Sequence, residues 1–400
     1  MKIGILREGK SPPDKRVPLT PEQCVEVQQK FAVKILIQPS KIRSFGDKEY
    51  INSGIQVIED LSDCDILLGV KEVNIKDLIE EKIYLFFSHT IKKQAYNRKL
   101  LQAVMSKKIQ LVDYEVLINK EGFRIIGFGR FAGLVGAYNA LRAFGLRNGM
   151  FDLKPAHLCY NLEEMLFHVS KIQLPAIKIA ITGNGRVANG VIEIMDQLKI
   201  KRVSPEEYIM YSVDQPVYTQ LIPAYYVRRK NGEKFDLMHF FNQPEMYENT
   251  FLPFAKTTDL LIAAAYWDPR APVLFTADEM KQNDFRISVI SDITCDIEGS
   301  IPSTKKASTI DEPFYDYNPQ TGKLEPAFSS LKNITVQAVD NLPCELPKDA
   351  SLDFGRNLID KVFPGLFGED ADGIIERASI TKNGKLTERF SYLQDFVDGK

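Results

Sequence analysis

The sequence predicts an α/β protein with two doubly wound, Rossmann-like domains, each built on a mostly parallel sheet. Its 400 residues exceed what one compact core usually holds. Short apolar segments alternate with helix-like segments through residues 1–130, which is typical of parallel strands joined by helices. A second unit of the same kind begins at residue 176, where an apolar strand, a glycine turn and a helix follow one another.

In the first domain, the helix expected over 21–31 has the clearest start signal. Thr20 is a good N-cap, and Pro21 suits the first helical position. A second helix is expected over 93–106. Six apolar runs are strand candidates: 2–8, 33–38, 65–71, 83–89, 110–117 and 123–129.

The second domain is expected to span 135–324, with 1–134 and 325–400 forming the first. A helix over 131–145 is apolar throughout, and Gly133 and Gly136 near its start indicate close packing on another element. The basic run 227–235 is predicted to be a solvated hairpin or loop. The other expected elements are helices over 161–172, 186–198, 350–362 and 386–396, and strands over 176–183, 260–265 and 287–293.

The composition argues against several classes of protein. The net charge of −2 offers no basic excess for nucleic acid. The five cysteines are scattered and form no C-x-x-C pair, so we expect neither a disulfide framework nor a metal site. No apolar run approaches the ~20 residues that cross a bilayer, and the opening reads as a strand rather than a leader. We therefore expect a reduced, cytoplasmic protein that binds no membrane.

The segment 181–190, ITGNGRVANG, is the motif with the clearest mechanism. Gly183 suits a tight turn, Gly185 lets the backbone approach a pyrophosphate, and the helix start offers N–H groups and partial positive charge. Ala188 occupies the usual third glycine position. The alternative is a turn that binds nothing. The candidate cofactor contacts are Gly183, Asn184, Gly185, Arg186 and Val187.

The same pattern leaves the choice between NAD and NADP open. About 20 residues after the loop, where an acidic residue usually holds the ribose, lie charges of both signs. Glu206 or Glu207 would suit a ribose hydroxyl, whereas Lys201 or Arg202 would suit a 2′-phosphate.

Charged residues follow the strands of the first domain, at the edge where open α/β sheets bind ligands. Lys71 is a candidate base if burial lowers its pKa, and His89 is a candidate acid–base group because histidine side chains in general exchange protons near neutral pH. Arginine and lysine would hold carboxylates. The simple alternative is that these residues cap solvated strand ends. The candidates are Arg16, Lys71, Glu72, His89, Lys92, Asp113, Glu115, Arg124 and Arg130.

These residues carry a family resemblance. Residues 2–20 resemble the start of the alanine dehydrogenase and transhydrogenase N-terminal family. The segments 71–72, 88–92, 112–115 and 126–133 are similar to lysine-forming saccharopine dehydrogenases. The second half agrees with the reductase half of the bifunctional animal enzyme, through the segments 182–190, 265–267, 291–301 and 339–347. The likeness covers nearly the whole chain, and no saccharopine-cleaving half is present.

The resemblance implies two domains with a cleft between them, a discontinuous first domain, and reversible oxidation of saccharopine to lysine and 2-oxoglutarate through an imine. Lys71 would accept the proton of the secondary amine, and His89 would serve the addition of water and the collapse of the carbinolamine. Glu72 would tune Lys71. Arg16, Lys92 and Arg130 would bind substrate carboxylates, with Arg124 and Glu115 nearby, and Tyr266 and Asp292 would join the contacts to NAD, with NADP left open.

Two other functions compete with this one. An alanine dehydrogenase would use the same fold, Lys71 and His89 on a smaller substrate, although Lys92 and Arg130 favour a substrate with more carboxylates. A transhydrogenase subunit is a weaker option because no membrane segment follows. A non-catalytic dinucleotide sensor is the alternative from another class, and the retained Lys71 and His89 pair argues against it. The oligomeric state is left open, with a homo-oligomer among the options.

Overall fold

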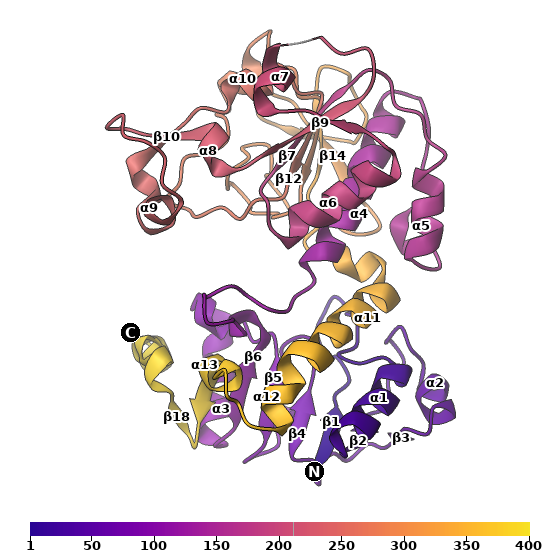
Figure 1. Ribbon diagram of the computed structural model, residues 1–400, viewed down its shortest axis with the longest axis vertical. Helices are drawn as coiled ribbons and strands as arrows, with labels where there is room; N and C mark the ends of the chain where they lie inside the picture. Colours follow the sequence, from indigo (N-terminus) through magenta and orange to yellow (C-terminus); the bar gives the residue numbers. More distant parts are fainter. Residues whose placement is uncertain (211) are drawn as a thin grey trace. The chain divides into compact units, whose positions relative to one another are not determined.

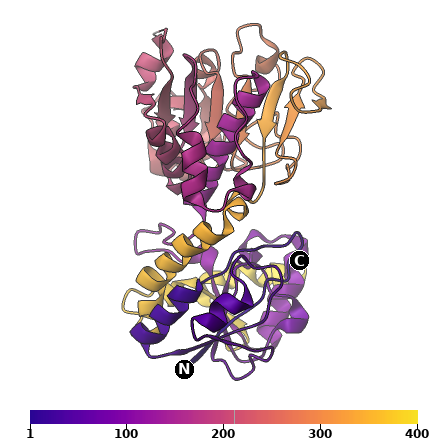
Figure 2. The ribbon, with the colours of Figure 1, turned by 90° about the vertical axis from the view of Figure 1, so that its right-hand side faces the viewer.

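The computed structural model describes residues 1–210 and 212–400, which form two compact units (Figure 1). The first unit joins Met1–Phe128 to Pro347–Lys400, so both termini lie in it (Figure 2), and the second unit is Gly129–Leu346. These bounds differ from the expected 134 and 324. Helix α4 (Gly129–Arg147) starts at the first bound, and residues 325–346 stay in the second unit because β16 (Ile334–Gln337) is a strand of its sheet.

The first unit is built on an eight-stranded sheet in the order β18-β17-β6-β5-β4-β1-β2-β3. Strands β1 to β6 pair in parallel, and β17 and β18 from the C-terminal segment add an antiparallel edge. The strands are β1 (Lys2–Ile5), β2 (Lys34–Ile37), β3 (Gln56–Val57), β4 (Ile66–Leu68), β5 (Ile83–Phe86), β6 (Gln110–Asp113), β17 (Ser379–Lys382) and β18 (Lys385–Leu386).

The strand expected over 123–129 is wrong. Residues 119–123 make a turn, and Arg124 forms only an isolated bridge with Ile118. The place beside β6 is taken by β17, so this segment does not pair with β6, and Gly129 already begins α4.

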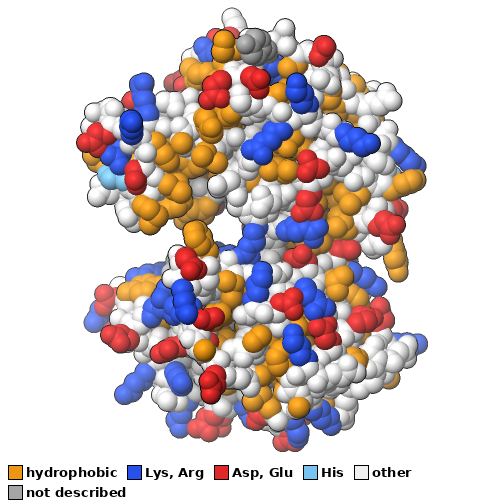
Figure 3. Space-filling view, viewed as in Figure 1, with side chains coloured by type: hydrophobic (Ala, Val, Ile, Leu, Met, Phe, Trp, Pro, Cys, Tyr) orange, Lys and Arg blue, Asp and Glu red, His pale blue; other side chains and the backbone are white. Residues whose placement is uncertain are grey.

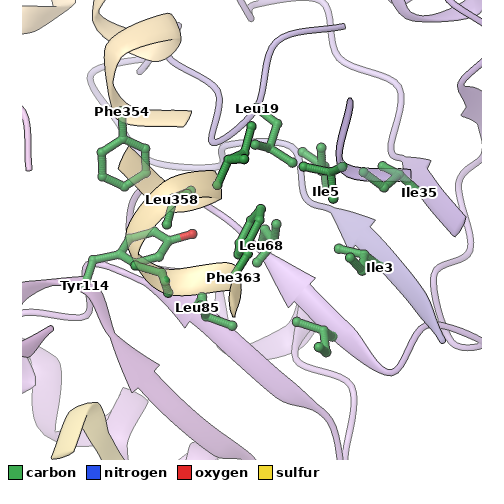
Figure 4. Close-up of a cluster of buried hydrophobic side chains, with 14 of the residues drawn as sticks. Ile3, Ile5, Leu19, Ile35, Leu68, Leu85, Tyr114, Phe354, Leu358 and Phe363 are labelled. Atoms are coloured by element: carbon green, nitrogen blue, oxygen red, sulfur yellow. The ribbon is translucent and has the colours of Figure 1, made fainter. Parts of the chain in front are cut away.

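Side chains alternate between the two faces of the first sheet, as parallel strands that are covered on both sides require. Ile3, Ile5, Leu68 and Leu85 belong to one buried cluster, which also contains Phe354, Leu358 and Phe363 from the returning chain (Figure 4). Leu67, Tyr84 and Phe86 belong to a second cluster with α3 and the C-terminus. The helices are α1 (Pro21–Phe31), α2 (Asp47–Asn52), α3 (Arg98–Ser106), α11 (Pro347–Asn357), a π-turn (Leu358–Val362), α12 (Phe363–Phe367), α13 (Ile374–Ala378) and α14 (Gln394–Asp398).

The second unit carries another eight-stranded sheet, in the order β15-β14-β16-β13-β12-β7-β9-β8. Six of these strands are parallel: β8, β9, β7, β12, β13 and β16. After β7 the chain forms β8 and β9 on one side of β7, and it later forms β12 on the other side. This reversal is the topological switch point, where open sheets bind ligands. The bounds are β7 (Lys178–Thr182), β8 (Lys201–Arg202), β9 (Val217–Leu221), β12 (Leu260–Ala263), β13 (Val289–Asp292), β14 (Phe314–Tyr317) and β15 (Leu324–Glu325).

The main helices of the second unit are α4, α5 (Leu162–Val169), α6 (Arg186–Gln197) and α7 (Pro205–Met210). Between β9 and β12 the chain makes an insertion that contains a two-stranded hairpin of β10 and β11. The basic run 227–235 starts this hairpin, but its partner strand follows a helix rather than a tight turn. The insertion contains α8 (Pro223–Tyr226), β10 (Val227–Arg229), α9 (Leu237–Asn242), β11 (Tyr247–Asn249) and α10 (Leu252–Ala255).

Helices α4 and α6 touch through their glycines. A Cβ atom on Gly133 would lie 1.9 Å from the carbonyl oxygen of Val187, and one on Gly190 would lie 2.1 Å from the carbonyl oxygen of Arg130. Each helix therefore presses its backbone on the other where a glycine leaves room. This explains the unusual glycine spacing of the loop, because Gly190 serves helix packing and Ala188 fills the buried third position.

Among the described residues, no helix is both long and apolar enough to cross a membrane. The five cysteines are free thiols. Within residues 1–210 and 212–400, no group of three or more His, Cys, Asp or Glu side chains is arranged to hold a metal ion.

Replacing Gly133 with Ala should lower the free energy of unfolding by about 1–3 kcal/mol, because the added methyl group forces α4 and α6 apart. Thermal unfolding followed by circular dichroism measures the change. Gly185→Ser is the matched control, since no atom lies within 4 Å of its Cβ position and Ser is a favoured N-cap. A Gly133→Ala chain as stable as the native one would show that the close contact is dispensable.

Candidate active site

Four ionisable side chains follow or end neighbouring strands at one edge of the first sheet, because parallel strands end there together. Glu8 follows β1, Lys71 follows β4, His89 follows β5 and Asp113 ends β6. Strands β1, β4, β5 and β6 are consecutive neighbours. The sequence predicted Lys71 and His89 at this edge but assigned no role to Glu8.

Glu72 contacts both His89 and Lys10. Its carboxylate accepts a hydrogen bond from Nδ1 of His89 at 2.5 Å and pairs with Nζ of Lys10 at 3.0 Å. Burial alone would raise the pKa of Glu72, but the hydrogen bonds of His89 and Lys10 outweigh it and lower the pKa to about 2. The Glu72 carboxylate thus orients the imidazole. Its negative charge also acts on Lys71 and favours the charged amine, so the expected tuning of Lys71 by Glu72 stays a prediction.

His89 is held in an unusual backbone conformation. Its φ of 55° is left-handed, which is uncommon for a residue other than glycine. The flanking Ser88 and Thr90 are fully buried, and their hydroxyls lie 2.8 Å apart. Asp113 accepts hydrogen bonds from both N–H and hydroxyl of Ser88 and, through its other oxygen, from the N–H of Glu115. One buried carboxylate therefore fixes the segments that carry His89 and Glu115, and burial raises its pKa to about 6.

Lys71 is a half-buried amine among charges of both signs. Burial, followed by the repulsion of Arg16, lowers its pKa, which favours the neutral form that a general base needs. Glu8 accepts the N–H groups of Val70 and Lys71 at 2.7 and 2.9 Å, so it fixes the backbone of the lysine. Burial raises the pKa of Glu8 to about 7.

Arg16 is buried with Asp14, which receives its guanidinium through two side-chain hydrogen bonds of 3.0 and 2.5 Å. Burial opposes the charge of Asp14, but the contacts of Arg16 outweigh it and hold the pKa well below its usual range. The guanidinium also lies 4.1 Å from the ring centre of Phe128. Arg16 is close enough to Lys71 to lower its pKa. Asp14, which holds Arg16, was not among the residues predicted from the sequence.

The other predicted cations divide between the two units. Glu115 pairs with Lys92 at 3.4 Å and with Arg124 at 3.2 Å, which joins three of the predicted residues. Arg130 instead lies in the first turn of α4 in the second unit and makes two 2.7 Å hydrogen bonds to Glu193 of α6. A substrate carboxylate on Arg130 would have to share or displace that partner.

The glycine loop joins β7 to α6 at the switch point. Gly183 has a φ of +93°, and its N–H bonds to the carbonyl of Leu221. Ala265 stands 3.0 Å from the place that a Cβ on Gly183 would take, so only glycine fits there. Gly185 is the N-cap of α6 and faces open space, with Asn184 exposed and Arg186 and Val187 half-buried beside it. The start of the twelve-residue helix α6 is thus open to an anionic group.

Tyr266 and Asp292 differ sharply in exposure. Tyr266 follows β12 and is 86% exposed. Asp292 is buried, and its carboxylate accepts hydrogen bonds from Thr294, Cys295 and Thr304. Those bonds fix the loop after β13, so Asp292 would act on a cofactor through that loop.

The strand that pairs with β7 on the side where the ribose is usually held is β9. It lies later in the chain than the segment 201–207, which sequence spacing suggested. Glu206 and Glu207 lie on α7, where Tyr208 accepts a hydrogen bond from Lys178 at the start of β7. That is the opposite end of the sheet from the glycine loop. Arg202 is instead linked to the glycine loop. Its guanidinium donates to Oε1 of Gln220, and the amide of Gln220 donates to the carbonyl of Gly183.

Comparison with known proteins agrees with these features. Residues 4–135 match the family model "Alanine dehydrogenase/PNT, N-terminal domain". The chain is 29% identical to the mitochondrial alpha-aminoadipic semialdehyde synthase of Mus musculus over 100% of its own length and 48% of that protein. It is 23% identical to the NAD(+), L-lysine-forming saccharopine dehydrogenase of Neurospora crassa, over 86% of each chain. The chain thus spans about half the length of the mouse relative.

The solved structure of an L-alanine dehydrogenase matches all of this chain and 99% of its own, with a TM-score of 0.63 and 14% identity. The predicted α/β fold with two Rossmann-like units is therefore confirmed. The resemblance to lysine-forming saccharopine dehydrogenases, inferred from short segments, is also confirmed over 86% of the chain, and the resemblance to the alanine dehydrogenase and transhydrogenase family is confirmed for residues 4–135.

Glu72→Gln should lower the unfolding free energy at neutral pH by about 2 kcal/mol, since a charged hydrogen-bond acceptor is lost. The pKa of Glu72 is depressed in the folded state, so its stabilisation is present above pH 4.5 and is lost as the pH falls toward about 2. Urea unfolding at several pH values should show the gap between native and variant chains closing over that range. Glu59→Gln is the control, because its pair with Arg7 is exposed. A gap that persists at the acidic end would contradict the pairing of an ionised Glu72.

Proposed function

We propose that the chain is an NAD(P)-dependent oxidoreductase acting on a CH–NH bond, and specifically an L-lysine-forming saccharopine dehydrogenase. The carrying observation is the cluster of Lys71 and the Glu72–His89 pair at one sheet edge of the unit that matches the alanine dehydrogenase family model. The relatives named as saccharopine dehydrogenases support the substrate. The substrates would be saccharopine in one direction and lysine with 2-oxoglutarate in the other.

The chemistry needs two proton carriers with different properties. As hydride leaves the carbon beside the secondary amine, a base must accept the amine proton, and Lys71 suits this because burial lowers its pKa. Water then adds to the imine carbon, and the C–N bond breaks after a proton reaches nitrogen. His89 suits both proton transfers, with Glu72 stabilising the protonated ring.

Saccharopine also needs cations for its carboxylates. Arg16 offers a planar guanidinium near Lys71. Lys92 and Arg124 both form ion pairs with Glu115. Glu115 keeps one carboxylate oxygen buried and without a hydrogen-bond partner within the described part of the chain. An amine of the substrate, such as that of lysine, would satisfy this oxygen.

The second unit would hold the dinucleotide at the glycine loop. The open space at Gly185 and the N–H groups at the start of α6 fit a pyrophosphate. The nicotinamide ring, when bound, accepts or returns the hydride. Arg186 and Val187 begin the helix that would bind the phosphates.

The coenzyme choice would rest on Arg202. No Asp or Glu occurs from Gln215 to Gly232, the segment that contains β9 and its end, so no carboxylate stands where NAD enzymes hold the ribose. Arg202 is linked to the glycine loop through Gln220. This favours a 2′-phosphate and hence NADP.

A cytoplasmic location stays a prediction, because the mouse relative is named as mitochondrial.

An assay with paired substrates tests the reaction. Oxidation of NADPH and NADH should proceed with lysine plus 2-oxoglutarate and not with pyruvate plus ammonia. Activity with pyruvate and ammonia alone would make the chain an alanine dehydrogenase. Coenzyme binding without turnover of either pair would favour the sensor.

Lys71→Met should lower kcat by about 10²–10⁴-fold, because a positioned base is removed, while the Kd for coenzyme stays within error. Lys76→Met is the control, an exposed lysine of the same unit. Retained turnover in Lys71→Met would remove Lys71 from the chemistry.

Arg202→Glu should raise the KM for NADPH by about 10-fold or more and leave the KM for NADH little changed, since a charged contact to phosphate is worth ~1.5–3 kcal/mol. Lys201→Glu provides the same charge change on the adjacent exposed residue. An equal effect of Arg202→Glu on both coenzymes would place the 2′-phosphate elsewhere.

A further inference from the structure

The returning C-terminal chain builds a cavity in the first unit that the proposed reaction does not use. The volume of this cavity is about 760 Å³, within the ~300–1,000 Å³ that is usual for small-molecule sites. Its walls are formed by α12, α13, β17 and the chain after β18, together with Gln110 at the start of β6. The described residues that line it include none of those predicted to bind substrate or coenzyme.

Charges of both signs line this cavity without pairing with one another. Figure 3 shows acidic and basic side chains interspersed over the part of the first unit that carries α13 and β18. Within residues 1–210 and 212–400, five charged side chains of the wall form no ion pair: Arg377, Lys382, Arg389, Glu376 and Glu388. A sixth, Asp370, accepts the backbone N–H groups of Ile374 and Glu376. Such a wall complements a ligand that itself carries both charges.

Arg377 brings an unneutralised positive charge into the wall. Its side chain is half-buried, with Nη1 donating to the carbonyl of Asp372 at 2.6 Å and Nη2 to that of Ile118 at 3.2 Å. Nε is buried and has no hydrogen-bond partner in the part of the chain that the structure describes. Because a charge removed from water is usually met by an opposite charge, this guanidinium would be stabilised by a carboxylate in the cavity.

The same arginine connects the cavity to the candidate active site. Ile118, which accepts its hydrogen bond, follows the short helix Tyr114–Val116, and that helix packs against α13. Ile118 also forms a bridge with Arg124, which pairs with Glu115. A ligand that draws the guanidinium of Arg377 away from Ile118 would therefore loosen the segment that carries Glu115 and Arg124.

We propose that this cavity binds a free acidic α-amino acid and that Arg377 relays its occupancy to Glu115 and Arg124. The two carboxylates of the ligand would meet the cations of the wall, and its ammonium group would meet Glu376 or Glu388. The binding itself is independent of the proposed reaction, whereas the effect of the ligand on turnover rests on that proposed function.

Isothermal titration calorimetry of the full chain with L-glutamate, in the absence of coenzyme, tests the binding. L-Glutamate should bind saturably. Glutarate has the same two carboxylates but no ammonium group, so it should bind about 5-fold more weakly. Absence of a saturable heat with L-glutamate, or an equal affinity for glutarate, would overturn the proposal.

Lys382→Glu should weaken the binding of L-glutamate by about 10-fold, because an attraction is replaced with a repulsion. Lys34→Glu is the matched control. Both lysines are exposed, stand at one end of a strand in the same sheet and form no ion pair among the described residues, but only Lys382 lines the cavity. Equal affinities of the two variants would place the amino acid elsewhere and overturn the proposal.

The relay is tested by turnover. L-Glutamate should raise the KM for lysine by about 5-fold in the native and Lys34→Glu chains and not in Lys382→Glu. Arg377→Lys keeps the charge but not the fork that holds two carbonyls, so it should bind L-glutamate without this effect on KM. Inhibition that persists in Lys382→Glu would be competition at the active site and would overturn the relay, as would native inhibition in Arg377→Lys.

The two proposals fail in different ways. A chain that binds L-glutamate through Lys382 but does not turn over lysine and 2-oxoglutarate would remove the proposed function and keep the cavity as a binding site. A chain that turns over this pair but binds no L-glutamate in the absence of coenzyme would keep the proposed function and remove the amino-acid site.

Discussion

The parallel pairing of β1, β4, β5 and β6 is the constraint on which the candidate active site depends. Only this pairing brings residues that lie far apart in the sequence, such as Glu8, Lys71, His89 and Asp113, to one edge. A shift of one residue in the register of β5 would turn His89 to the other face of the sheet. The returning C-terminal chain seals one face with Phe354 and Phe363, so it stabilises the register without contributing a charged group to the cluster.

The charges at this edge differ because their partners differ. Glu72 is surrounded by cationic donors and stays ionised, whereas Glu8 receives only backbone N–H groups and is easily protonated. Lys71 is pushed toward the neutral amine by burial and by Arg16. Two carboxylates and one lysine with displaced pKa values, close to a histidine, are the arrangement expected where protons are moved.

Much of this could be predicted from the sequence where the signal is local. Thr20 and Pro21 fixed the start of α1, which spans the expected residues 21–31. Lys71 and His89 stood out because they follow apolar strands. The contacts around these residues could not be found in this way, since Glu72 is 17 positions from His89 and 62 positions from Lys10, and the three meet only through the sheet. The position of β9 was missed for a similar reason, because α7 intervenes at the far end of the sheet.

The glycine contact between α4 and α6 has a consequence for engineering. Loops that bind coenzymes are often treated as cassettes that can be exchanged between enzymes. Here the helix behind the loop is seated on another helix through Gly133 and Gly190, with backbone against backbone. A transplanted loop would keep its geometry only if both helices travelled with it, so the unit of exchange in this protein is a helix pair.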